Sequence, residues 1–133
     1  MFKLKVVWKD TDLIECLVEA KSATFAGGAR LYFTEDTLRQ FARDISGFPK
    51  TASDRRVFST KNSEAGNSLA FALSCSSALG AACASAQIVN AEETGETAHV
   101  LFPVEAGAVD VFERELLAMS QTGEGEAILH DAR

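Results

Sequence analysis

Residues 65–91 read AGNSLAFALSCSSALGAACASAQIVNA and contain no Asp, Glu, Lys or Arg. A membrane-spanning helix needs about 20 predominantly apolar residues. This stretch instead carries Asn67, Gln87, Asn90 and several serines. In its first half, Leu69 and Phe71 alternate with small residues, which is the side-chain spacing of a β-strand. We therefore predict two strands, at about 67–76 and 81–91, instead of one apolar helix.

The alternation gives this strand pair two unlike faces. One face carries a row of large apolar side chains suited to a core, and opposing small residues let the two strands fit together. The predicted pairs place Phe71 beside Ala86, and the next strand, at about 97–105, continues the row. On that next strand we pair Ile88 with Val100, Ala86 with Phe102, and Ala84 with Val104.

The opposite face carries small, neutral side chains, which permit close approach by another layer. Its residues are Ser68, Ala70, Ala72, Ser74, Cys83, Ser85 and Gln87, with His99 and Leu101 beyond them. Three interpretations fit this face: coverage within the monomer, contact with a second copy in a homo-oligomer, or the floor of a small-molecule pocket. The residues alone leave all three open.

Upstream of this centre, residues 2–9 and 13–21 predict a β-hairpin that turns at Asp10-Thr11-Asp12. Apolar and polar residues alternate along both segments, which is typical of half-buried strands. The register that keeps the two faces separate pairs Trp8 with Ile14, Val6 with Cys16, Leu4 with Val18, and Lys3 with Glu19.

A third strand and a helix follow the hairpin. Gly27-Gly28 supplies a turn before a strand at Ala29–Thr34. Thr34 is a good helix N-cap, and acidic residues follow it in the first turn, where they suit the helix dipole. Leu38, Phe41, Ala42 and Ile45 repeat at helical spacing, Gly47 ends the helix and Pro49 prevents its continuation.

The remaining segments complete the predicted fold. We expect a strand at about 54–60, turns at Lys61–Gly66 and Glu93-Thr94-Gly95, an amphipathic helix at about 107–119, and a short strand at 125–130. Such hairpins interrupted by helices predict an α+β fold. We expect a largely antiparallel β-sheet of about seven or eight strands, with two amphipathic helices packed on it, in one domain spanning residues 1–133.

Composition narrows the classes of partner and the location. The net charge of −6 disfavours duplex nucleic acid and anionic membrane surfaces, which both attract basic patches. The three cysteines are odd in number and widely spaced, which does not predict a disulfide framework. The first residues lack the apolar stretch of a signal peptide. We therefore expect a cytoplasmic protein.

The sequence offers little evidence of catalytic chemistry. His99 and His130 are the two histidines, and neither lies in a recognisable nucleophile motif. The acidic group Glu92, Glu93 and Glu96 surrounds a turn without calcium-loop spacing. Gly27-Gly28 lacks the rest of a phosphate-binding motif. We predict no catalytic residues, no metal site and no cofactor, and an enzyme is the less favoured class.

Two basic features form a candidate contact with an anion or a partner protein. Arg30 and Tyr32 share the outward side of the third strand, while Arg55 and Arg56 begin the strand after the first helix. We treat these four residues as one candidate surface.

The segment from Phe25 to Pro49 carries a resemblance to known proteins. It reads Phe-Ala-Gly-Gly-Ala-Arg-Leu-Tyr-Phe, then Leu38, Phe41-Ala42 and Gly47-Phe48-Pro49. It resembles a group of short, functionally uncharacterised bacterial α+β proteins with a Phe-x-Gly strand, a helix and a Gly-Phe-Pro exit. The resemblance implies a bacterial origin and the α+β fold, and no activity.

These observations favour a non-catalytic interaction module that self-associates through the uncharged sheet face and also binds a protein partner. A small-molecule ligand-binding domain is the alternative, and an enzyme of unidentified class is the third hypothesis.

Overall fold

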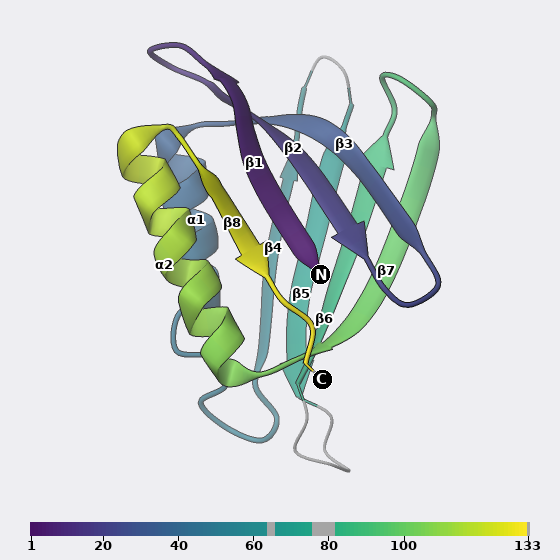
Figure 1. Cartoon of the computed structure of the whole chain (residues 1–133), viewed down its shortest axis with the longest axis vertical. Helices are drawn as coiled ribbons and strands as arrows, with labels where there is room; N and C mark the ends of the chain where they lie inside the picture. The colour runs from purple at the N-terminus through teal and green to yellow at the C-terminus, as the bar shows by residue number, and fades with distance from the viewer. Residues whose placement is uncertain (64–65, 76–81, 133) are drawn as a thin grey trace.

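Two four-stranded antiparallel sheets face each other, and two helices lie side by side where the sheets diverge (Figure 1). This computed structural model describes residues 1–63, 66–75 and 82–132. The first sheet has the order β3-β2-β1-β8 and the second has the order β4-β5-β6-β7. The elements are β1 (Phe2–Lys9), β2 (Ile14–Lys21), β3 (Ala26–Phe33), α1 (Glu35–Ile45), β4 (Arg55–Lys61), β5 (Ser68–Cys75), β6 (Ala82–Asn90), β7 (Glu96–Val104), α2 (Ala106–Thr122) and β8 (Glu126–Leu129).

A cluster of phenylalanine rings joins both sheets and both helices in the core. Phe41 of α1 stacks on Phe58 of β4 with ring centroids 4.2 Å apart, and Phe2 of β1 lies 4.9 Å from Phe71 of β5. Phe112 of α2 contacts this cluster edge-on at 5.6–5.8 Å. Edge-to-face and offset ring contacts at these distances are favourable beyond their apolar burial. The cluster therefore links every layer of the molecule.

Three asparagine side chains from the second sheet and its turns hydrogen-bond to the free edge of β3. Asn62 accepts from the Tyr32 N–H at 2.9 Å and donates to the Tyr32 carbonyl at 3.1 Å. Asn67 donates to the Arg30 carbonyl and Asn90 to the Gly28 carbonyl, at 2.9 and 3.1 Å. An edge strand otherwise presents unpaired backbone groups, so these side chains satisfy the edge and hold the two sheets together.

The predicted α+β class, with antiparallel strands and two helices, is confirmed, and the strands divide into two sheets of four. The predicted helix at α1 is confirmed together with its Thr34 cap, whose hydroxyl accepts from the Thr37 N–H. The second helix is longer than predicted and ends at Gly123, which has a left-handed backbone. Among the described residues, no helix has the length and apolar character that crossing a membrane requires.

The predicted β1–β2 register is correct for part of the hairpin and wrong at its turn end. Val6 faces Cys16, and Leu4 faces Val18, as predicted. A β-bulge at Val7 then shifts the register, so that Trp8 faces Glu15 and Lys9 faces Ile14. Because side chains alternate between faces, one extra residue moves Trp8 from the core side to the outer side.

The predicted pairing of Phe71 with Ala86 is confirmed, but the register of the next strand is wrong by two residues. Ala86 faces Val100, not Phe102, and Ala84 faces Phe102. The connection between these strands lies one residue earlier than predicted, since β6 ends at Asn90 and β7 begins at Glu96. The predicted strand ends at Ser76 and Ala81, and part of the Lys61–Gly66 turn, lie outside the described residues.

Candidate functional site

The outer face of the second sheet is exposed and almost free of charge. We call it the neutral face: Ser68, Ala70, Ala72, Ser74, Cys83, Ser85 and Gln87, flanked by Val57 and Leu101. One cross-strand row runs Val57, Ala72, Ser85, Leu101, with large residues outside and small ones between. Val57 is 58% exposed and Leu101 is 56% exposed. Among the described residues, no element covers this face. The described part of the chain therefore does not support the interpretation that the monomer covers the face itself.

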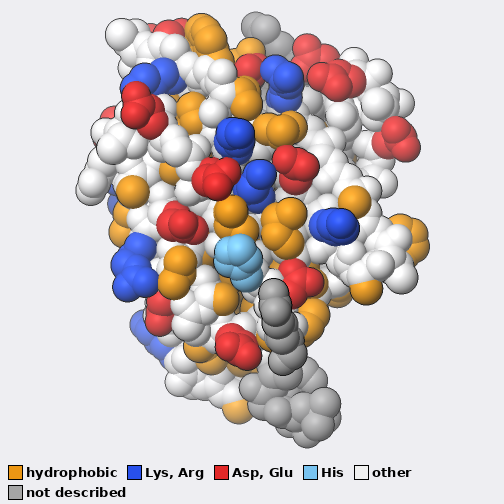
Figure 2. Space-filling view, in the orientation of Figure 1, with side chains coloured by type: hydrophobic (Ala, Val, Ile, Leu, Met, Phe, Trp, Pro, Cys, Tyr) orange, Lys and Arg blue, Asp and Glu red, His pale blue; other side chains and the backbone are white. Residues whose placement is uncertain are grey.

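The outer face of the first sheet provides a direct contrast within the same chain. Figure 2 shows basic and acidic side chains interspersed across this face. Lys3 faces Glu19 across the β1–β2 pair, and Arg30 lies 3.8 Å from Glu15. An antiparallel sheet face that contacts water is expected to carry charged residues, and this face does. The neutral face therefore differs in chemistry from its counterpart, not in strand geometry.

The neutral face also holds a hydroxyl and an imidazole within hydrogen-bond distance. Ser85 Oγ lies 2.9 Å from His99 Nε2. Acyl-transfer chemistry also needs N–H donors for the developing oxyanion. Ser85 lies in the central strand β6, where its backbone N–H is used by the ladder of paired strands, whereas His99 lies on the edge strand β7. We therefore describe the pair as a hydrogen bond that links the outer sides of β6 and β7.

A second candidate surface is an open cleft of about 800 Å³ near the β1–β2 and β6–β7 turns. Trp8 of β1, Leu13 of the β1–β2 turn and Tyr32 of β3 form its apolar wall, and Lys61 and Glu92 are among its polar lining residues. The Trp8 and Tyr32 rings are 6.5 Å apart at 88°. We call this the aromatic cleft. The bulge at Val7 is what brings Trp8 to it.

Tyr32 is held in place from several sides. Asn62 bonds both backbone groups of Tyr32. The nearby Glu15 carboxylate, through its polar interaction with the Tyr32 hydroxyl and its negative charge, raises the pKa of the Tyr32 phenol, and Glu92 adds a weaker effect. Tyr32 is thus a fixed wall of the cleft beside negative charge.

The four basic and aromatic candidates from the sequence do not form one surface. Arg30 and Tyr32 lie at the cleft end of the molecule. Arg55 lies at the far end of β4, about 20 Å from the Lys61 end at 3.3 Å per residue. The structure therefore separates Arg30 and Tyr32 from the other pair.

Arg56 has a structural role at the start of β4. Its side chain donates to both Asp54 carboxylate oxygens, at 2.9 and 3.0 Å, and to the Ser46 carbonyl at 2.7 Å. This hydrogen bonding lowers the pKa of Asp54. Arg56 thereby ties the end of α1 to β4, which leaves its guanidinium occupied by the chain itself.

The cysteines and the other acidic groups form no further site in the described part of the chain. Cys16 is buried, and burial raises the pKa of its thiol to about 12, which leaves it unreactive. Cys75 and Cys83 are free thiols as well. No group of three or more potential metal ligands is found among residues 1–63, 66–75 and 82–132.

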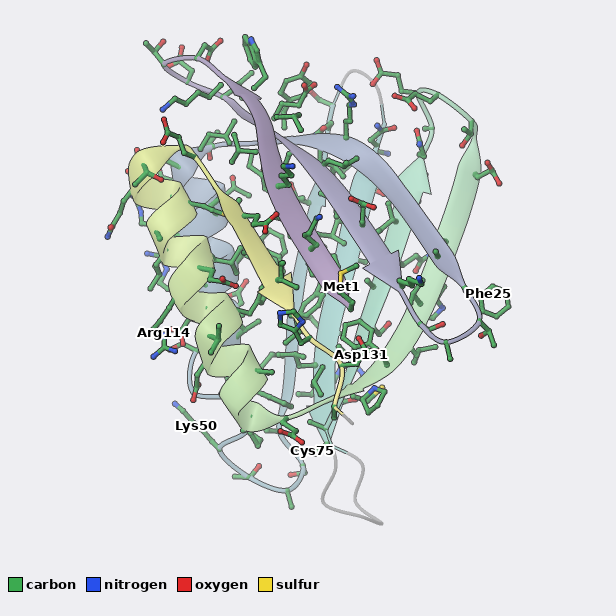
Figure 3. The ribbon with its side chains drawn as sticks, viewed as in Figure 1. Met1, Phe25, Lys50, Cys75, Arg114 and Asp131 are labelled. Atoms are coloured by element: carbon green, nitrogen blue, oxygen red, sulfur yellow. The ribbon has the colours of Figure 1, made fainter. Side chains whose placement is uncertain are left out.

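Two features of the surface lie apart from both candidates. Phe25 is 70% exposed at the β2–β3 turn, and the Met1 amino group forms an ion pair with Asp131 (Figure 3). Phe25 stands alone, and single exposed apolar residues are ordinary on protein surfaces.

Comparison with models of protein families, with curated proteins and with solved structures finds no match to this chain. The resemblance of Phe25–Pro49 to short bacterial proteins therefore stays a prediction. The neutral face and the aromatic cleft are the two candidate functional surfaces of the described chain.

Sequence reasoning missed the aromatic cleft. The alternation along the first strand predicts Trp8 on the core side, and the sequence groups Glu92 with other acidic residues around a turn. One signal was present: the chain has a single tryptophan and a single tyrosine. A tryptophan beside a hairpin turn is a candidate for surface display, but only the bulge determines the face on which it lies.

Proposed function

We propose that this chain is a non-catalytic interaction module that self-associates through the neutral face. The observation that carries the proposal is the contrast between the two outer sheet faces. One has charges of both signs across it, while the described positions of the other are charged only at Arg55 and Lys61 on the β4 edge. Depletion of charge at the centre of a surface is typical of protein interfaces.

The dimensions of the face support a small interface with a second copy. Four strands about 4.8 Å apart and about 25 Å long give a flat area of roughly 500 Å². This is below the roughly 800 Å² per partner of a standard stable complex. We therefore expect a weak dimer, with a dissociation constant in the micromolar range.

The Val57–Ala72–Ser85–Leu101 row explains how two copies fit together. In a two-fold arrangement with the two rows aligned, Val57 of each copy lies opposite Leu101 of the other, and the small residues between them face each other. Burial of each exposed Val or Leu side chain contributes about 1 kcal/mol here, because part of each is already covered. The small residues allow the two sheets to approach without charged side chains between them.

Sedimentation velocity over a concentration series tests this proposal. We expect the wild-type chain to shift from monomer towards dimer at about tens of micromolar. Leu101→Glu places a charge in the contact and should abolish the shift, since an unpaired buried charge is strongly unfavourable.

Leu17→Glu is the matched control, because it makes the same change on the outer face of the first sheet, between Lys5 and Arg30. This variant should associate as the wild type does. A wild-type chain that remains monomeric at about ten times the expected dissociation constant would overturn the proposal, and so would equal loss of association in both variants.

Two further observations support a cellular location and a source organism class for the protein. All three cysteines are free, which is typical of a reducing compartment. This supports a cytoplasmic location, and the Phe25–Pro49 resemblance supports a bacterial source. A small-molecule binding domain is the second candidate function, and the aromatic cleft is the observation that favours it.

A further inference from the structure

The aromatic cleft has the features of a recognition site, independently of the neutral face. Its two rings are the chain's only tryptophan and tyrosine, and they are 49% and 42% exposed. A β-bulge next to a site often serves to re-aim a side chain. Here the bulge at Val7 turns Trp8 outward, against Tyr32.

The Trp8 and Tyr32 rings stand nearly perpendicular, and because both side chains are exposed, part of each ring can contact a ligand. An aromatic face attracts cations through its quadrupole, and tryptophan attracts them most strongly. Tyrosine and tryptophan are also the side chains most enriched at the energetic centres of protein interfaces. The apolar wall therefore favours a ligand that combines an aliphatic stem with a positive charge.

The charges around the cleft point to the same ligand. The β1–β2 and β6–β7 turns carry Asp10, Asp12, Glu92 and Glu93 and contain no Lys or Arg. In the described part of the chain these four carboxylates form no ion pair. Of the four, Glu92 lines the cleft itself and forms no ion pair within the described residues, whereas Asp10 accepts hydrogen bonds from the Asp12 and Leu13 N–H groups.

Two of the positive features near the cleft lie beside negative charge, and a third, Lys61, forms no ion pair with a described residue. Arg30 lies 3.8 Å from Glu15, and the positive end of the α1 dipole is offset by Glu35 and Asp36 in the first turn. Lys61 in the cleft lining is the remaining cation. Replacing Lys61 therefore tests whether the cleft binds a cation or an anion.

We propose that the aromatic cleft binds a Lys or Arg side chain presented by a basic segment of a partner protein. The aliphatic stem lies along Leu13, the cationic group lies over Trp8 beside Tyr32, and the Glu92 carboxylate interacts with the positive charge. The neutral face has no part in this contact, so the outcome is independent of self-association.

Intrinsic fluorescence provides a direct assay, since Trp8 is the only tryptophan in the chain. The probe is Ac-Gly-Arg-Gly-NH₂, and the control probe replaces Arg with the neutral isostere citrulline. We expect a saturable change in Trp8 emission with the Arg peptide, at a millimolar dissociation constant suited to one side chain. The citrulline peptide should bind at least about tenfold more weakly, since it lacks the charge that both the ring and the carboxylates recognise.

Two single-residue variants test the direction of the charge effect. Glu92→Gln should weaken binding of the Arg peptide about threefold, whereas Glu113→Gln on α2, away from the cleft, should leave it unchanged. Lys61→Gln should tighten binding about twofold, because it removes a like charge from the cleft lining. Circular dichroism checks that each variant folds as the wild type does.

Each contrary result overturns the proposal. Equal binding of the Arg and citrulline peptides would show that the cleft does not recognise charge. Binding of Ac-Gly-Glu-Gly-NH₂ that weakens in Lys61→Gln would show an anion site. No saturable change at about 50 mM Arg peptide would show that the cleft does not bind this side chain.

Discussion

Gly27 marks a place where the two sheets approach each other closely. It lies within β3, so the prediction of a turn at Gly27-Gly28 is wrong. An ideal Cβ on Gly27 would lie 2.3 Å from the Cβ of Ala98 on β7. Real Cβ atoms do not approach so closely, so any larger residue forces the sheets apart at this point. The glycine is required here by the neighbouring strand and not by its own backbone angles.

Gly27→Ala should therefore destabilise the protein by about 1–3 kcal/mol, the usual effect of overpacking a close contact. Urea denaturation measures this as a lower midpoint with an unchanged slope. Gly107→Ala is the control, because no atom lies within 4 Å of the added Cβ. We expect that variant to be neutral or slightly stabilised. Equal midpoints for Gly27→Ala and the wild type would show that the sheets separate there without strain.

At the scale of elements, the position of β3 depends on side chains that bond its backbone. Asn67 is 2% exposed, and it joins the Arg30 carbonyl to the Glu92 N–H, at 2.9 Å each. One side chain therefore connects the edge of the first sheet to the β6–β7 turn. That turn also presents Glu92 to the aromatic cleft.

Asn67→Ala should cost about 1–2 kcal/mol, because it removes two part-buried hydrogen bonds, to the Arg30 carbonyl and from the Glu92 N–H. Hydrogen exchange should show faster exchange at the Glu92 amide, which loses its acceptor. Gln121→Ala on the exposed side of α2 is the control and should change stability by less than about 0.5 kcal/mol. If the Asn67 variant kept wild-type protection at Glu92, water would be replacing the side chain, and the bridging role would be disproved.

The same elements show what the sequence can and cannot predict. Local signals were sufficient for α1, where Thr34 caps the start and Gly47 follows the end. They also placed Phe71 beside Ala86, since large and small residues had to match. They failed at Trp8, where a bulge adds one residue and moves the side chain to the outer side. They also failed at the β6–β7 register, where both strand ends lie one residue earlier than predicted.

The candidate sites divide in the same way. The neutral face was predictable residue by residue, because it follows from alternation in a stretch without charges. The aromatic cleft was not predictable, since it brings together the β1–β2 hairpin, the start of α1, the end of β4 and the β6–β7 turn. Such convergence depends on how two sheets face each other, which no single strand's pattern records.

At the scale of the whole molecule, the phenylalanine cluster makes the two sheets one unit. Phe41 of α1 contacts Phe58 and Phe71 of the second sheet, Phe2 of the first sheet and Phe112 of α2. The rings span all layers, so neither sheet keeps a complete core without the other. Such a chain is expected to unfold cooperatively, as small single domains do.

Phe41→Leu tests this coupling, and it should destabilise the protein by about 1–2 kcal/mol through loss of ring contacts and apolar burial. Trp8 fluorescence follows the first sheet, and the His99 side-chain NMR signals follow β7 in the second. Both probes should give one midpoint in the wild type, and both midpoints should fall together in the variant. If only the His99 transition moved, the sheets would be separate folding units, and the cluster would stabilise the second sheet alone.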